Sequence, residues 1–135
     1  MSAPLTIFQV AGRAMSAQLV RMNTTASNLA NAGGVAGSAE AAYKTMKPVF
    51  RTSFDQASSL ATVDVEKVVT AGDAPTKRYD PSNPLADKDG NVFEAAVDET
   101  RELVDMMETA RSYQNNVEVM NTAKSLILDT LKMGR

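Results

Sequence analysis

A cluster of acidic side chains follows residue 93 and is the first candidate for chemistry in this chain. Their spacing would place several of them on one face of a helix. Two carboxylates held close together can act as general acid and base, and a larger group can bind a metal ion. The cluster lies near the start of a long predicted helix, where acidic groups favour the positive end of the helix dipole, so we interpret it as a solvated face. The residues are Glu94, Asp98, Glu99, Glu102, Asp105 and Glu108.

Two further segments resemble ligand-binding motifs. The run DKDGN, residues 87–91, resembles a calcium loop, but Gly90 is misplaced relative to Asp87 and no bidentate Glu occupies the twelfth position. We predict a turn there. The glycines of NAGGVAGS, residues 31–38, do not follow a strand with phosphate-loop spacing and lack the required Lys, which indicates a hinge.

The composition excludes most catalytic classes. The 135 residues contain no His, Cys or Trp, so the commonest general base, the thiol nucleophile and the main soft metal ligands are missing. The net charge is −2, from 14 basic and 16 acidic residues that are interspersed along the chain, which gives no electrostatic footprint for nucleic acid. We therefore predict no catalytic residue, no cofactor, no metal, no nucleic-acid partner and no small-molecule substrate.

The N-terminal segment is predicted to form an amphipathic helix from Leu5 to Leu29, stopped by the glycines at 33 and 34. Its polar half is rich in Asn, Thr and Ser, which are poor helix formers, so the helix needs support from tertiary or quaternary contacts. It has no basic residue before its apolar positions and no apolar run long enough for a cleaved export signal or a membrane span. The apolar face comprises Phe8, Ala11, Met15, Leu19, Met22, Ala26 and Leu29.

The C-terminal segment is predicted to form a second, longer helix from about Glu94 to Lys132. A helix of that length would span about 58 Å, well beyond the roughly 37 Å diameter of a compact globule of this size, so we expect a rod-shaped molecule. The expected a and d positions of a heptad are Ala96, Leu103, Met106, Ala110, Tyr113, Val117, Met120, Ile127 and Leu131.

The two helices are expected to pair as an antiparallel, coiled-coil-like hairpin through these apolar stripes. Met107, Val119, Leu126 and Leu128 lie off the stripe and would stay exposed, which calls for neighbouring subunits. The methionines fit either as ordinary core filler or as flexible contacts to neighbours that differ from one another.

The middle of the chain is predicted to be a short β-hairpin followed by extended chain. Residues 43–54 and 61–70 are rich in β-branched and aromatic residues, as strands are, whereas residues 73–91 have the Pro, Gly and Asp content of turns. Two short strands are marginal alone, so the hairpin must pack on the helices or on another subunit.

Three segments resemble the flagellar basal-body rod proteins. RMNTTASNLANA, residues 21–32, resembles the N-terminal signature that rod and hook proteins share. Two further segments resemble stretches of the proximal-rod branch of this family. They are YDPSNPLADKDGNV, residues 79–92, and RSYQNNVEVMNTAKSLILDTL, residues 111–131. The loop 31–44 and the start of the last helix depart from the family pattern.

The resemblance implies a structural subunit of the proximal rod, the part of the drive shaft that transmits motor torque to hook and filament. It implies passage through the flagellar type III export apparatus without a cleaved signal peptide, and a final position in the rod that crosses the periplasm. The implied partners are copies of the chain itself and other rod proteins, namely proximal and distal rod subunits and the protein at the junction with the MS ring. It also implies terminal helices that fold only on incorporation.

The predicted organisation is mainly α with a small β section: an N-terminal axial helix at 1–32, a middle section at 33–93 and a C-terminal axial helix at 94–135. Amide and apolar side chains of the two helices are the expected carriers of subunit contacts. Because a buried Asn without its partner costs about 1–3 kcal/mol, Asn28→Leu should damage assembly register more than export. The interface candidates are Met22, Asn23, Asn28, Leu29, Asn31, Tyr113, Asn116, Val117, Met120 and Asn121.

Two other functions compete with this interpretation. A helical adaptor that binds one partner through the same stripe predicts a well-folded monomer at low concentration. An enzyme has only scattered carboxylates in its favour.

Overall fold

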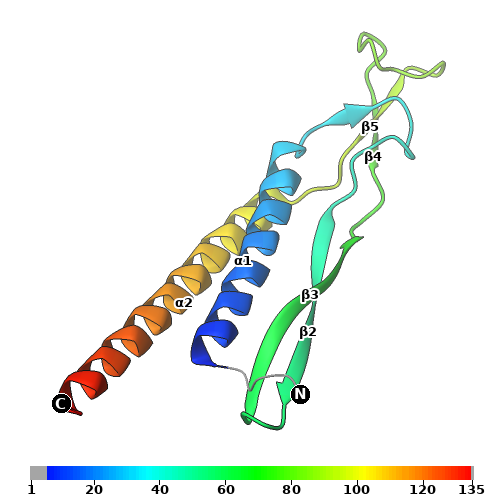
Figure 1. The fold of residues 1–135 in the computed structure, drawn as a ribbon. Helices are drawn as coiled ribbons and strands as arrows, with labels where there is room; N and C mark the ends of the chain where they lie inside the picture. The colour runs from blue at the N-terminus through cyan, green and yellow to red at the C-terminus, as the bar shows by residue number, and fades with distance from the viewer. Residues whose placement is uncertain (1–5, 135) are drawn as a thin grey trace.

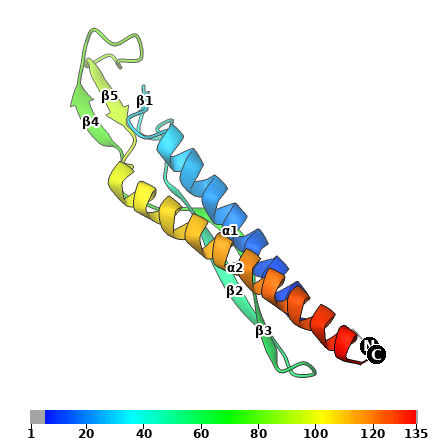
Figure 2. The same ribbon diagram turned by 90° about the vertical axis from the view of Figure 1, so that its left-hand side faces the viewer.

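The computed structural model describes residues 6–134 and shows an elongated molecule (Figures 1 and 2). Two helices and a long β-hairpin run along its length, and a small second sheet lies at one end. The elements in chain order are α1 (Ile7–Ala30), β1 (Val35–Ala36), β2 (Met46–Asp55), β3 (Leu60–Thr70), β4 (Thr76–Tyr79), β5 (Asn91–Glu94) and α2 (Glu99–Met133).

Helix α1 begins with a capping box. The Thr6 hydroxyl accepts a hydrogen bond from the Gln9 backbone N–H at 3.3 Å, and the Gln9 side chain accepts one from the Thr6 N–H at 2.9 Å. The helix ends at Ala30 with Asn31 as its C-cap, and Gly33 follows in the left-handed region at φ 73°. The predicted start at Leu5 lies outside the described residues.

Helix α2 begins at Glu99, later than predicted, because residues 91–94 are drawn into strand β5. Asp98 caps it by accepting the Arg101 backbone N–H at 3.1 Å. At 35 residues it spans about 52 Å, so the expected rod shape is confirmed.

The antiparallel pairing of α1 with α2 is confirmed, but the predicted contact face of α2 is only partly right: Met106, Ala110, Tyr113 and Met120 are half-buried, and Leu103 and Val117 are exposed. Glu102 and Thr109 are buried and Asp105 is half-buried, whereas the predicted a and d residues Leu103 and Leu131 are 52% and 64% exposed. Each of these three residues of α2 therefore lies one position before a residue of the predicted apolar stripe, namely Leu103, Met106 or Ala110. Glu102 and Asp105 form hydrogen bonds to α1, whereas the Thr109 hydroxyl donates to the Asp105 carbonyl on its own helix.

Strands β2 and β3 form the predicted antiparallel hairpin, longer than expected at 10 and 11 residues. The hairpin lies along α1, with Thr62 1% exposed on the side that meets the helix. The register shifts between Val49 and Phe50, which leaves Glu66 of β3 without a partner in the ladder.

A second sheet, of order β1-β5-β4, was not predicted. It joins the segment after α1 to the segment before α2, and Val92 of β5 is fully buried in it. The expected turn at 87–91 is confirmed, since the Asp87 carboxylate accepts the backbone N–H groups of Asp89 and Asn91.

The interior of the chain is small and largely polar. Its buried apolar residues are mostly alanines, which bring backbones close but contribute little hydrophobic area. The buried apolar residues are Ala11, Ala17, Ala42, Val92 and Ala95, and the buried polar ones are Thr24, Thr25, Asn28, Thr45, Thr62, Glu102 and Thr109.

Candidate subunit interface

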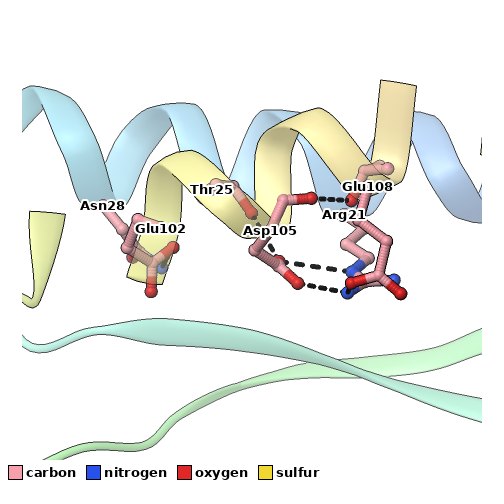
Figure 3. Close-up of polar contacts among 7 residues, drawn as sticks. Arg21, Thr25, Asn28, Glu102, Asp105 and Glu108 are labelled. Carbon is pink, nitrogen blue, oxygen red and sulfur yellow. Dashed lines mark hydrogen bonds and ion pairs between the residues drawn. The ribbon is translucent and has the colours of Figure 1, made fainter. Parts of the chain in front are cut away.

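A line of polar contacts, here called the polar seam and formed by Arg21, Thr25, Asn28, Glu102 and Asp105, joins α1 to α2 (Figure 3). The Arg21 guanidinium donates to both carboxylate oxygens of Asp105, with Nε at 3.2 Å from Oδ2. The Thr25 hydroxyl donates to the same Oδ2 at 3.1 Å. A bidentate Arg–carboxylate pair fixes geometry as well as adding energy, so the seam sets the register of the two helices.

The seam also perturbs its two charged groups. Burial raises the pKa of Asp105, but the hydrogen bond and charge of Arg21, together with Thr25 and Lys47, outweigh it and hold that pKa below the ordinary 3.8. The hydrogen bond to Asp105 raises the pKa of Arg21 against the opposing effect of burial. Both shifts favour the ion pair, so the seam keeps its charges at neutral pH.

Asn28 lies at the centre of three elements and is 1% exposed. Its Nδ2 donates to the Met46 carbonyl at 2.9 Å and to a Glu102 carboxylate oxygen at 3.1 Å. Its Oδ1 accepts the Met46 N–H at 2.9 Å and the Tyr43 hydroxyl at 2.8 Å. An Asn side chain has two donors and two main acceptor sites, so all its capacity is used within the chain.

The predicted solvated face of carboxylates is therefore wrong for Glu102 and Asp105, which face α1. Glu99 and Asp98 are exposed as expected. Glu108 is also largely exposed, although an oxygen of its carboxylate lies 3.6 Å from Arg21 Nη2. Sequence reasoning missed the seam because it sought apolar residues for the helix interface. The signal that could have revealed it is the helix-unfriendly Asn and Thr content of residues 23–28.

The outer surface of α2 is rich in large apolar side chains. Leu103, Val104, Met107, Val117, Val119, Leu126, Ile127, Leu128, Leu131 and Met133 are between 37% and 81% exposed. Every described residue from 124 to 134 is exposed, and that segment lies beyond the start of α1. An apolar surface of this extent marks an interaction site. The expected exposure of Met107, Val119, Leu126 and Leu128 is confirmed.

The apolar stripe of α1 faces away from the β-hairpin. Asn28 points to the hairpin, and Leu19 lies nine positions before it, so at about 100° per residue the two side chains lie on opposite sides of α1. Leu19 is 44% exposed, and Met15, Met22 and Leu29 are half-buried. The helix layer therefore offers apolar groups on the side that the hairpin leaves free.

Two family descriptions match the chain at the two helical regions. The "Flagella basal body rod protein" family matches residues 8–37, and the "Flagellar basal body rod FlgEFG protein C-terminal" family matches residues 89–133. FlgC of Salmonella typhimurium is 43% identical over 98% of this chain and 99% of its own length. FlgC of Escherichia coli O6:H1 is 44% identical over the same shares, and that of Yersinia enterocolitica 41% over 97% and 98%. The chain belongs to the FlgC family of flagellar basal-body rod proteins.

In this FlgC-family chain, the first matched region comprises nearly all of α1 and the turn into β1, and the second comprises β5 and α2. Both sides of the polar seam therefore lie in the matched regions. The resemblance found in the residues of the two ends is confirmed. The family is one of structural rod subunits and not of enzymes.

The predicted interface residues of the FlgC-family chain fall into two groups. Asn28 is directed inward, and the Asn116 amide donates to the Ser112 carbonyl on its own helix at 3.0 Å. All except Asn28 remain at least partly accessible: Asn23, Asn31, Val117 and Asn121 are exposed, and Met22, Leu29, Tyr113, Asn116 and Met120 are half-buried.

A groove of about 450 Å³ runs between α1, α2 and β2, with the polar seam as its floor. Phe50 and Val104 stand on opposite sides of it and are both exposed.

Across residues 6–134, no cluster of three or more acidic side chains is placed to bind a metal ion. Neither described helix has the length and apolar content needed to cross a membrane.

Proposed function

We propose that this chain is a structural subunit of the proximal rod that assembles helically and transmits torque from motor to hook and filament. One observation carries the proposal: polar groups fill the inside of the protomer while large apolar groups stand outside. An isolated globular protein buries its large apolar side chains first, so this arrangement suits a subunit whose main hydrophobic contacts lie between chains.

The proposed partners are further copies of the chain and other rod proteins, namely proximal and distal rod subunits and the protein at the junction with the MS ring. The exposed apolar side chains of α2 form two groups, at 103–107 and 117–133, on a helix that spans about 52 Å, which suits contacts with more than one neighbour. The proposed interface carriers are the accessible candidates of both helices, Met22, Asn23, Leu29, Asn31, Tyr113, Val117, Met120 and Asn121. We assign Asn28 and Asn116 to hydrogen bonds within the subunit and not to contacts between subunits.

We propose the two helical ends, 1–32 and 94–135, as the axial layer and the middle section 33–93 as the outer part. The position of the β-hairpin on one side of α1, with the apolar stripe of α1 turned the other way, supports this division. Delivery through the flagellar type III export apparatus requires an unfolded chain. A small interior joined by polar contacts suits a protomer that unfolds readily and gains most of its stability on assembly.

The test is incorporation into basal bodies in a flagellated bacterium that lacks its own copy of this rod subunit. The unchanged chain should restore swimming and be recovered in isolated basal bodies. Val117→Asp should abolish both, because Val117 is exposed in the protomer and a charge would be buried between subunits. Glu118→Asp, at the next and also exposed position, should have no effect. Normal basal bodies with Val117→Asp would contradict the interface assignment.

Proteolysis and far-UV circular dichroism of the purified chain test the proposal that the ends fold on assembly. Labile helical ends around a resistant middle section would support it. A uniformly resistant, strongly helical monomer would favour the helical adaptor instead.

A further inference from the structure

The middle of the molecule contains a junction at which one buried side chain serves three elements. Asn28 of α1 forms two hydrogen bonds with the backbone of Met46, the first residue of β2, and one with Glu102 of α2. The Tyr43 hydroxyl, from the segment leading to β2, adds a fourth. No other described side chain forms hydrogen bonds to both the hairpin segment and α2.

The pair of bonds to Met46 has the geometry of strand pairing. The amide of Asn28 offers one donor and one acceptor side by side, and it receives the N–H and the C=O of a single residue, both at 2.9 Å. Two bonds to one backbone unit fix its direction as well as its distance. The start of β2 is thus held at one angle to α1.

The other polar attachment of the hairpin to α1 is much weaker. Arg13 Nη1 lies 3.3 Å from an Asp64 carboxylate oxygen and 3.5 Å from the Thr62 hydroxyl. The two charged side chains are 47% and 37% exposed, so water and salt screen their attraction. Asn28 is inaccessible to water, and its bonds are not screened in this way.

Helix α2 is joined to the hairpin by hydrogen bonds only through this junction, among the described residues. Among the described residues, no Cα atom of α2 approaches one of β2 or β3 within 8 Å. Glu102 nevertheless accepts one of the two N–H groups of the same amide whose other N–H holds Met46. If Glu102 is absent, one buried N–H of the amide loses its acceptor, which weakens the whole junction and with it the hold on Met46.

We propose that Asn28 is a positioning residue that sets the angle of the β2–β3 hairpin to the helix layer and makes the seating of the hairpin depend on the docking of α2. The inference concerns the folded protomer and not the contacts between subunits, so the distances are measured in labelled chains recovered in basal bodies if the helical ends are labile in the free chain.

The distance between the hairpin tip and α1 tests the proposal in the full chain. The sequence contains no cysteine, so spin labels can be placed at Ala57→Cys in the hairpin turn and Ser16→Cys on α1 without removing native thiols. The parent should give one narrow distance distribution. Asn28→Leu should broaden it and should speed amide exchange at Met46 about tenfold, the change expected when a hydrogen bond is lost.

Glu102 provides the sharper comparison because its hydrogen bond is to Asn28 of α1 and not to the hairpin. Glu102→Leu removes the acceptor and should broaden the distribution, whereas Glu102→Gln keeps an acceptor oxygen and should leave it narrow. Glu118→Leu, at an exposed position of α2, is the control and should have no effect.

Unfolding of α1 is an inadequate explanation for the expected change, since Leu favours helix more than Asn does. Circular dichroism checks that helix content is kept. If Asn28→Leu does not fold, Glu102→Leu and Tyr43→Phe, which removes only one donor, take its place. A distribution already broad in the parent, or one unchanged by these substitutions, would overturn the proposal.

Discussion

The Arg21–Asp105 pair should stabilise the helix hairpin by a measurable coupling energy. Asp105 accepts two hydrogen bonds from Arg21 and one from Thr25, and the two charged side chains are only 23% and 32% exposed. Hydrogen bonds to charged groups contribute about 1.5–3 kcal/mol each when well buried. Partial exposure reduces this, so we expect a coupling of about 1–2 kcal/mol for the pair.

A double-mutant cycle with Arg21→Met and Asp105→Asn isolates that coupling. Both replacements are close in size to the native side chains, so packing changes little. The assay is urea unfolding of the full chain at neutral pH and low salt, followed by circular dichroism. Asp129→Asn with Lys132→Met, an exposed pair 3.9 Å apart near the end of α2, is the matched control and should give a coupling near zero.

The pH dependence provides the second half of this test. The folded-state pKa of Asp105 is lowered from 3.8, so the unfolded chain takes up the proton first as pH falls. The stabilisation is complete well above the unfolded-state pKa of 3.8, and it is lost as the pH falls from there through the lowered folded-state pKa. The Arg21→Met variant should lack most of this acid-dependent loss. A coupling below about 0.5 kcal/mol at neutral pH, or equal acid sensitivity in parent and variant, would refute the role assigned to the pair.

Three further predictions concern other elements. Leu128→Ser on the exposed face of α2 should change the free energy of unfolding by less than about 0.5 kcal/mol, yet reduce incorporation into basal bodies; a large loss of monomer stability would contradict the exposure of that face. Gly90→Ala should destabilise the β4–β5 loop by about 1–2 kcal/mol, measured by amide exchange across that loop. Its φ is +79° and a Cβ would meet Tyr79 Cε2 at 2.9 Å, and unchanged exchange would count against this backbone conformation. Asp98→Ala should cost about 1 kcal/mol through loss of the α2 cap, with faster exchange at Arg101 as its signature and Glu99→Ala as the control.

The helices and the long hairpin were predictable because their patterns extend over many residues. Apolar spacing of three and four residues identified α1 and α2, and the β-branched run at 61–70 identified β3. The small sheet was not predictable, since β1 has only two residues and β4 and β5 four each, and its partners are distant in the chain. Short strands of that kind are fixed by tertiary contacts and not by local propensity.

The direction of α2 relative to α1 was predictable, but the residues at their contact were predictable only in part. Leu103 and Leu131 satisfy the heptad pattern as well as any core residue, yet they are exposed. An apolar stripe indicates that a helix will be covered, and it does not indicate whether the same chain or a neighbour covers it. Glu102 and Asp105 would ordinarily be placed in water, and only the positions of Asn28 and Arg21 explain why they are not.

The two polar attachments of the β-hairpin to α1 together resist rotation of the hairpin relative to the helix. Arg13 and Asn28 are separated along α1 by about 22 Å at 1.5 Å per residue. A structural element attached at one point can rotate about that point, whereas one attached at two points rotates only by stretching one attachment. Its resistance to rotation grows with the square of the distance between the two attachments. In a rod that transmits torque, the weak attachment at Arg13 would therefore stiffen the angle between hairpin and helix by more than its bond energy suggests.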